Sequence, residues 1–168
     1  MDVEPLSPET VVVLVNGWGS IPRAEGARAE APPASAAPLP DWATADATAL
    51  ERIADLLFPV FATAGTAERA ELITGLLRRT KVLPTVSADG DSVAATWSVK
   101  DPRDALTAAA ALTLRRQLAE HDPARVGTCA ADGCADVYID VSARAHRRFC
   151  SVTCQNRTRV AAFRRRTK

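Results

Sequence analysis

The segment CAADGCADVYIDVSARAHRRFCSVTC, residues 129–154, contains every cysteine of the 168-residue chain. The cysteines form two close pairs with the spacing C-x4-C-x15-C-x3-C, at positions Cys129, Cys134, Cys150 and Cys154. Each short pair lets the backbone turn so that both thiolates face one point, and the two pairs can meet across the residues between them. Four thiolates at ~2.3 Å satisfy Zn²⁺ in a closed tetrahedral site. The spacing therefore predicts one structural zinc ion per chain.

Three other uses of the cysteines agree less well with the sequence. Disulfides need an oxidising compartment, and the acidic, proline-bearing start MDVEPLSPET has none of the features of a secretory signal. A dithiol redox site usually has two residues between its cysteines and is seldom doubled. An iron–sulfur cluster can use four cysteines, but the usual spacings differ. Structural zinc remains the favoured interpretation.

The residues between and after the pairs predict a treble-clef-like finger. Val137, Ile139 and Val141 alternate, which indicates a short hairpin with residues 142–146 as its turn. The second cysteine pair then leads into a helix. Its positive N-terminal end can partly offset the formal −2 charge of four thiolates and one zinc ion.

Residues 125–166 resemble a CGNR-type zinc finger. The matching segments are the C-x4-C pair, YIDVS (138–142), RRFCS (147–151), CQNR (154–157) and the basic residues that follow. Gln155 stands where the family has glycine, so the backbone there is not expected to need a positive φ. Such fingers form the C-terminal part of bacterial proteins that have an N-terminal ABATE domain. These proteins are regarded as stress-induced transcription regulators. The resemblance implies the same architecture and role here, and VLVN (13–16) is similar to an early motif of that domain.

Residues 1–124 predict an α-rich, ABATE-like domain. Apolar residues at three- and four-residue spacing indicate helices over 44–64, 66–81 and 101–120, whereas the run VVVLV (11–15) fits a strand or a buried helix. Alternation around Asp89-Gly90 indicates a β-hairpin near residues 82–99, and residues 22–40 form a Pro/Ala-rich loop. The expected fold class is mainly α with a β-hairpin, followed by the α+β finger at 125–168.

Charge separates these two parts. Residues 1–124 carry 11 Lys/Arg and 17 Asp/Glu, a balance of −6, whereas residues 125–168 carry 10 and 3, a balance of +7. Such a charge split is typical of a chain end that contacts nucleic-acid phosphates, and the alternative is a solvated basic tail. The candidate nucleic-acid-binding residues are Arg147, Arg148, Arg157, Arg164, Arg165 and Lys168. On a helix, Val160 and Phe163 lie away from the main arginine arc and are expected to pack on the finger's hairpin.

Two functions are consistent with these features. One is a zinc-binding transcriptional regulator whose finger binds DNA, while the N-terminal domain senses a signal or forms a homodimer. The alternative is a non-catalytic interaction module whose finger docks a protein, with its arginines serving the thiolate cluster or the acidic half of the chain. The sequence identifies no small-molecule ligand.

Catalysis and membrane insertion are not expected. A closed four-thiolate site has no open position to activate water. The only histidines, His121 and His146, belong to no recognisable catalytic motif, and no glycine-rich phosphate loop is present. No run of eighteen apolar residues exists, and together with the missing signal features this predicts a cytoplasmic protein.

Overall fold

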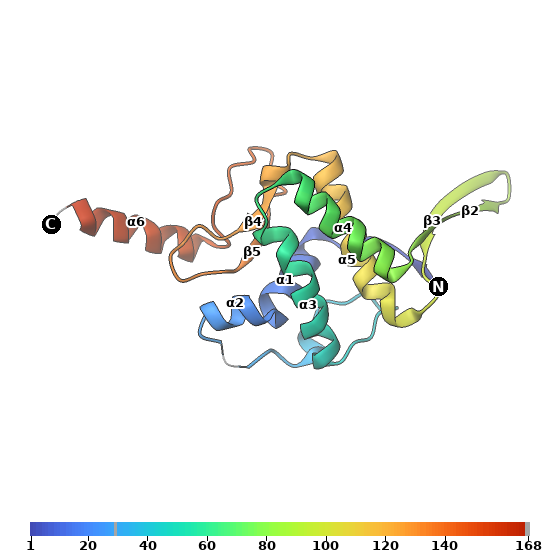
Figure 1. The fold of residues 1–168 in the computed structure, drawn as a ribbon, viewed down its shortest axis with the longest axis horizontal. Helices are drawn as coiled ribbons and strands as arrows, with labels where there is room; N and C mark the ends of the chain where they lie inside the picture. Colours follow the sequence, from blue (N-terminus) through green and yellow to red (C-terminus); the bar gives the residue numbers. More distant parts are fainter. Residues whose placement is uncertain (29, 167–168) are drawn as a thin grey trace.

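The computed structural model describes residues 1–28 and 30–166. A helical body carries a β-hairpin at one end and the C-terminal helix at the other (Figure 1). The α-helices are α1 (Pro8–Trp18), α2 (Ser20–Glu25), α3 (Ala47–Ala62), α4 (Thr66–Thr80), α5 (Ala105–Glu120) and α6 (Val152–Arg166). The strands are β1 (Asp2–Val3), β2 (Leu83–Asp89), β3 (Ser92–Ser98), β4 (Val126–Thr128) and β5 (Val137–Ile139). Short 3-10 turns lie at η1 (Ala34–Ala36), η2 (Pro102–Asp104) and η3 (Pro123–Arg125). The predicted class, mainly helical with a hairpin and a C-terminal four-cysteine finger, is confirmed.

Helices α1, α3 and α5 form the centre of the core. The apolar run at 11–15 is helical because Ser7 caps it, accepting a hydrogen bond from the Thr10 amide at 3.0 Å, and Pro8 suits the first turn. In α5 the alanines at 108–111 are fully buried, and their small side chains let neighbouring helices approach closely. No helix within the described residues is long and apolar enough to cross a membrane.

The Pro/Ala-rich segment is less irregular than expected. Helix α2 already includes residues 22–25, and η1 adds a further turn at 34–36. The prediction of a loop without elements is therefore wrong at these two places. Proline is tolerated at position 22 because it lies in the first turn of α2, where its missing N–H would have no intrahelical partner.

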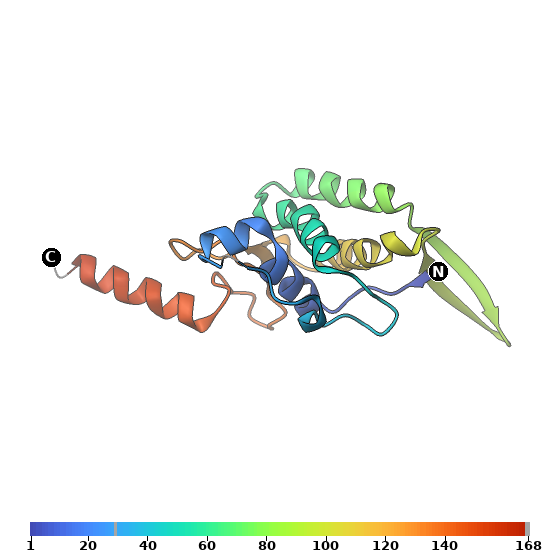
Figure 2. The same cartoon turned by 90° about the horizontal axis from the view of Figure 1, so that it is seen from below.

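The predicted hairpin near 82–99 is confirmed as strands β2 and β3. Their register runs from Leu83 opposite Ser98 to Asp89 opposite Ser92, and Gly90 occupies the turn with φ +60°. Strand β1, which is too short to leave a sequence pattern, pairs with the base of β3. Beyond this base the hairpin projects away from the helices (Figures 1 and 2).

A second sheet connects the finger to the body. Strands β4 and β5 pair antiparallel, and Val126, Val137 and Ile139 are buried in the same core as the helices. The sequence predicted a hairpin between the cysteine pairs with its turn at 142–146, and this is wrong. Strand β5 instead pairs backward with β4 across the first cysteine pair, and residues 140–149 form a loop without strands.

Candidate metal centre and basic groove

The first cysteine pair lies in the turn between β4 and β5. Cys129 follows β4 directly, and its amide donates to the Asp136 carbonyl at 2.8 Å, which closes the turn. Gly133 precedes Cys134 with φ +64°, a left-handed conformation that glycine adopts without a Cβ penalty. The resulting knuckle brings the thiols of Cys129 and Cys134 together.

The second pair lies at the start of α6. Cys150 lies two residues before the first residue of the helix, and Cys154 lies in its first turn. The Ser151 hydroxyl accepts a hydrogen bond from the Cys154 amide at 3.2 Å and so caps the helix. The positive end of α6 therefore faces the sulfur cluster, where it favours negative charge.

All four sulfur atoms lie within 4.8 Å of one another. The Sγ–Sγ distances are 3.8 Å for Cys134–Cys150, 3.6 Å for Cys150–Cys154 and 3.8 Å for Cys154–Cys134. A tetrahedron with Zn–S bonds of ~2.3 Å has edges of about 3.8 Å, whereas a disulfide needs ~2.05 Å. The four sulfurs therefore fit one zinc ion, as the spacing predicted.

Electrostatics also favours a cation at this place. Burial raises the pKa of the Cys134 thiol to about 11, and burial likewise raises the pKa of Cys150. These two thiols are therefore neutral around neutral pH without a cation. Burial also acts to raise the pKa of Cys154, but hydrogen bonds from Ser151 and the neighbouring thiols outweigh it and lower that pKa. A divalent ion offsets this desolvation and stabilises the thiolates.

Two of the predicted DNA-binding arginines are engaged around the metal centre. Arg147 donates through Nε to the Phe149 carbonyl at 3.0 Å and through Nη2 to the Cys150 carbonyl. Arg157 donates through Nη2 to the Cys154 sulfur at 3.7 Å and to the Asp132 carbonyl at 3.1 Å. Both guanidinium groups hold the knuckles in place.

Asp140 organises the loop between the cysteine pairs. Its carboxylate is buried and accepts hydrogen bonds from the amides of Ser142 at 3.0 Å and Arg147 at 2.8 Å. Burial acts to raise the pKa of Asp140, but the hydrogen bonds from Ser142 and Arg147 outweigh it and hold the pKa below its usual value. The Arg125 side chain adds hydrogen bonds to the carbonyls of Asp140 and Ser142. The loop is thus closed by side chains rather than by strand pairing.

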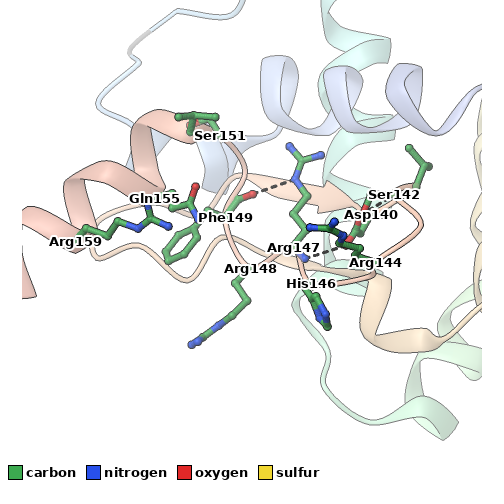
Figure 3. Close-up of a pocket in the computed structure, with 12 residues that line it drawn as sticks. Asp140, Ser142, Arg144, His146, Arg147, Arg148, Phe149, Ser151, Gln155 and Arg159 are labelled. Carbon is green, nitrogen blue, oxygen red and sulfur yellow. Dashed lines mark hydrogen bonds between the residues drawn. The ribbon is translucent and has the colours of Figure 1, made fainter.

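A basic groove of about 1010 Å³ lies between this loop and the first two turns of α6 (Figure 3). The basic groove is named for its lining residues Arg144, His146, Arg147, Arg148, Gln155 and Arg159, and the buried Asp140 lines it as well. Within the described part of the chain, the side chains of Arg144, Arg148 and Arg159 make no hydrogen bond or ion pair. In Figure 3, Arg159 extends beside Gln155, whereas Arg148 points away from the other labelled side chains. Arg144 and Arg159 were not among the predicted contacts, because only the folded loop reveals that they share a surface with Arg148.

Helix α6 leaves the body after its first turn (Figures 1 and 2). Cys154 is its only buried residue among those described. The expectation that Val160 and Phe163 pack on the hairpin is wrong, because these side chains are 49% and 62% exposed. Gln155 has ordinary helical backbone, so the glycine of the family is not required there, as predicted.

The remaining predicted contacts lie at the far end of this helix. Arg164 and Arg165 are exposed, and Arg165 approaches Asp132 at 4.0 Å, a weak surface pair. Lys168 lies outside the described residues.

Asn16 of α1 is a contact that sequence reasoning missed. Its amide nitrogen donates to the Val137 carbonyl at 3.0 Å, and its amide oxygen accepts from the Val137 amide at 2.7 Å. Arg28 adds an ion pair to Asp136 at 2.5 Å. These contacts join residues more than 100 positions apart, and the only signal was the VLVN motif, which indicates no partner.

Comparison with known protein families matches residues 125–167 to the CGNR zinc finger. The chain therefore contains a CGNR zinc finger domain whose four cysteines form the metal centre. The ABATE domain expected for residues 1–124 is not detected. No curated protein matches the chain.

Proposed function

We propose that the protein is a zinc-binding transcriptional regulator whose finger binds DNA through the basic groove and helix α6. The observation that carries the proposal is the set of three groove guanidinium groups, on Arg144, Arg148 and Arg159, without an acidic partner in the described structure. After Asp140 the chain has nine Lys/Arg and no acid. Such a surface favours a polyanion, and the guanidinium fork matches phosphate oxygens.

The shape of α6 supports a duplex as the polyanion. A 15-residue helix is ~22 Å long, and the major groove, about 12 Å wide, admits one helix. In the proposed complex Arg148 and Arg144 contact phosphates, while Gln155 and Arg159, one turn apart, face base edges. Arg164 and Arg165 extend the phosphate contacts along the helix, and Lys168, which lies outside the described residues, adds one more positive charge to this end of the chain. Arg147 and Arg157 act indirectly by fixing the knuckles.

Zinc has a structural role in this proposal. Four thiolates leave the ion no open coordination position, so the proposed role is non-catalytic. The N-terminal part would sense a signal or dimerise and pass the change to the finger, in the cytoplasm. The contacts of Asn16 and Arg28 with the first knuckle provide a physical connection for that coupling.

DNA binding is tested with zinc-loaded full-length protein and duplex DNA over a series of salt concentrations. We expect affinity to fall linearly on a log–log plot, because bound arginines release counterions. Changing Arg144, Arg148 and Arg159 to Gln should weaken binding roughly 10- to 100-fold at low salt. It should also lower the slope of the log–log plot by about two ion equivalents, one for each of the two phosphate contacts of Arg144 and Arg148. The control changes Arg78, Arg79 and Arg116 to Gln; these exposed residues lie on α4 and α5. Absence of binding at low salt, or equal losses in both variants, would contradict the proposal.

The second candidate is a finger that docks a protein partner. The exposure of Val152, at 70%, and of Val160 on α6 favours this function, because apolar side chains gain little from phosphate. It predicts that reversing the charge at Arg164 and Arg165 leaves DNA affinity unchanged and abolishes capture of a protein partner.

A further inference from the structure

The β2–β3 hairpin has one apolar face and one polar face. Residues directly opposite in the register share a face, as do alternate residues along each strand. One face carries Pro84, Val86, Ala88, Val93, Ala95 and Trp97. The other carries mainly hydroxyl groups, from Thr85, Ser87, Thr96 and Ser98, and the hydroxyls of Thr85 and Ser98 are 2.9 Å apart. The pattern is that of a strand pair with one buried side.

The apolar face is nevertheless exposed. Val86 and Val93 are 69% and 74% exposed, although both lie on the side that the pattern assigns to a core. Only the base is covered, where the Arg115 guanidinium lies 5.8 Å from the centre of the Trp97 ring. In Figures 1 and 2, no element from the described part of the chain lies beside the outer part of the hairpin. An isolated two-stranded hairpin is marginally stable in water, so such a face normally packs against a further layer.

We propose that this face packs against the same face of a second copy of the chain, forming a two-fold dimer. Val86 lies opposite Ala95, and Ala88 lies opposite Val93, so large and small side chains alternate in both directions. A two-fold axis running either along or across the strands places each valine of one copy over an alanine of the other. The face is therefore complementary to itself, as an isologous interface requires.

Charge and size agree with this occupant. Residues 83–99 contain no Lys or Arg, and their only charged residues are the two aspartates at 89 and 91 near the turn. The aspartates near the turn disfavour a nucleic acid as the partner. The face also has no basic group that could bind an acidic partner. Seven-residue strands are ~24 Å long, and two such faces together would bury on the order of 1,000 Å². This is the lower end of specific interfaces, so we expect a dimer in equilibrium with monomer.

The inference specifies the dimerising role in the proposed function, but it does not require DNA binding. The hairpin and α6 lie at opposite ends of the molecule (Figure 1), so the two surfaces can be altered independently. If the protein binds DNA but stays monomeric, the dimer proposal is wrong and the proposed function stands. If it dimerises but does not bind DNA, the dimer proposal stands and the proposed function is wrong.

The test is sedimentation of zinc-loaded full-length protein over roughly two orders of magnitude in concentration. We expect the wild type to pass from monomer to dimer, and V86D V93D to remain monomeric because four like charges would meet in the interface. The matched control, S87D T96D, places the same charges at the same diagonal spacing on the polar face of the same strands, and it should dimerise like the wild type. Thermal unfolding of each variant in the monomeric range shows whether the hairpin change has altered the fold.

Three outcomes would overturn the inference. The first is a wild type that is monomeric throughout the concentration range. This outcome counts against the dimer even if an unrelated protein binds the same face. The second is a V86D V93D variant that keeps the dimer. The third is an S87D T96D variant that loses the dimer as completely as V86D V93D. Where V86D V93D unfolds, the milder V86T V93T variant, which removes apolar contact without charge, should shift the equilibrium toward monomer by roughly tenfold.

Discussion

The molecule contains two β-hairpins that differ in length and in surroundings. Hairpin β2–β3 pairs seven residues on each strand, and most of its side chains are exposed. Hairpin β4–β5 pairs only three on each strand, yet all three residues of β5 are buried. The longer hairpin has a clear sequence signature, whereas the shorter one was predicted with the wrong partner strand.

The difference shows that neighbouring elements, rather than ladder length, hold a hairpin in this fold. Strands β4 and β5 lie against α1 and α3, and their turn carries two of the four zinc ligands. The free edge of β5 is covered by the side chain of Asn16. The β2–β3 hairpin has comparable support only at its base, from β1 and Arg115.

Removal of zinc should have the largest effect. It should unfold the second half of the finger and leave the first half, which lies in the core, folded. Structural zinc contributes about 10–16 kcal/mol in zinc-finger peptides, and α6 has little other contact with the body. We expect chelation to expose the amides of residues 140–166, including those of α6, to hydrogen exchange, while β5 and helices α1 to α5 stay protected. C150S and C154S should show the same pattern without chelator. Metal analysis should find one zinc per wild-type chain, and a lower content would contradict the assignment of the site.

How much of this could be predicted depends on sequence distance. The zinc ligands lie within 26 residues and were predicted from their spacing. The turn at Asp89-Gly90 was predicted from that dipeptide. Helices α3, α4 and α5 followed from local apolar periodicity. Three-residue strands carry too little pattern, so β4 was missed, and Val137 and Ile139 were assigned to a hairpin with the residues after them.

The basic groove could not be predicted for a similar reason. Its rim combines Arg144 and Arg148 from a loop with Arg159 from α6, and the loop conformation depends on the buried carboxylate of Asp140. The alternation in β3 correctly predicted a strand of the hairpin, but alternation does not say whether the same chain covers the apolar face of that strand. Among the described residues, no element covers the outer part of this face.

A pair of valine truncations tests the comparison directly. Val137 in β5 is fully buried and Val93 in β3 is 74% exposed. V137A should lower the free energy of unfolding by about 1–3 kcal/mol, because the removed methyl groups leave a cavity in the shared core. V93A, measured at a concentration where the protein is monomeric, should change it by less than about 0.5 kcal/mol. Chemical denaturation of the zinc-loaded proteins gives both values. Equal losses would mean that the hairpins are equally supported within one chain.

A smaller effect than that of V137A is expected at Asn16. N16A removes both hydrogen bonds that its side chain makes to the Val137 backbone, and it leaves a buried N–H and C=O without partners. We expect a loss of about 1–2 kcal/mol in the free energy of unfolding. Faster hydrogen exchange at the Val137 amide should accompany it. The control, N156A, alters an exposed asparagine of α6 and should leave both measurements unchanged. If N16A destabilised the protein while the Val137 amide stayed protected, Asn16 would be acting through α1 alone. The buried hairpin would then owe its stability to core packing and zinc, without a contribution from its covered edge.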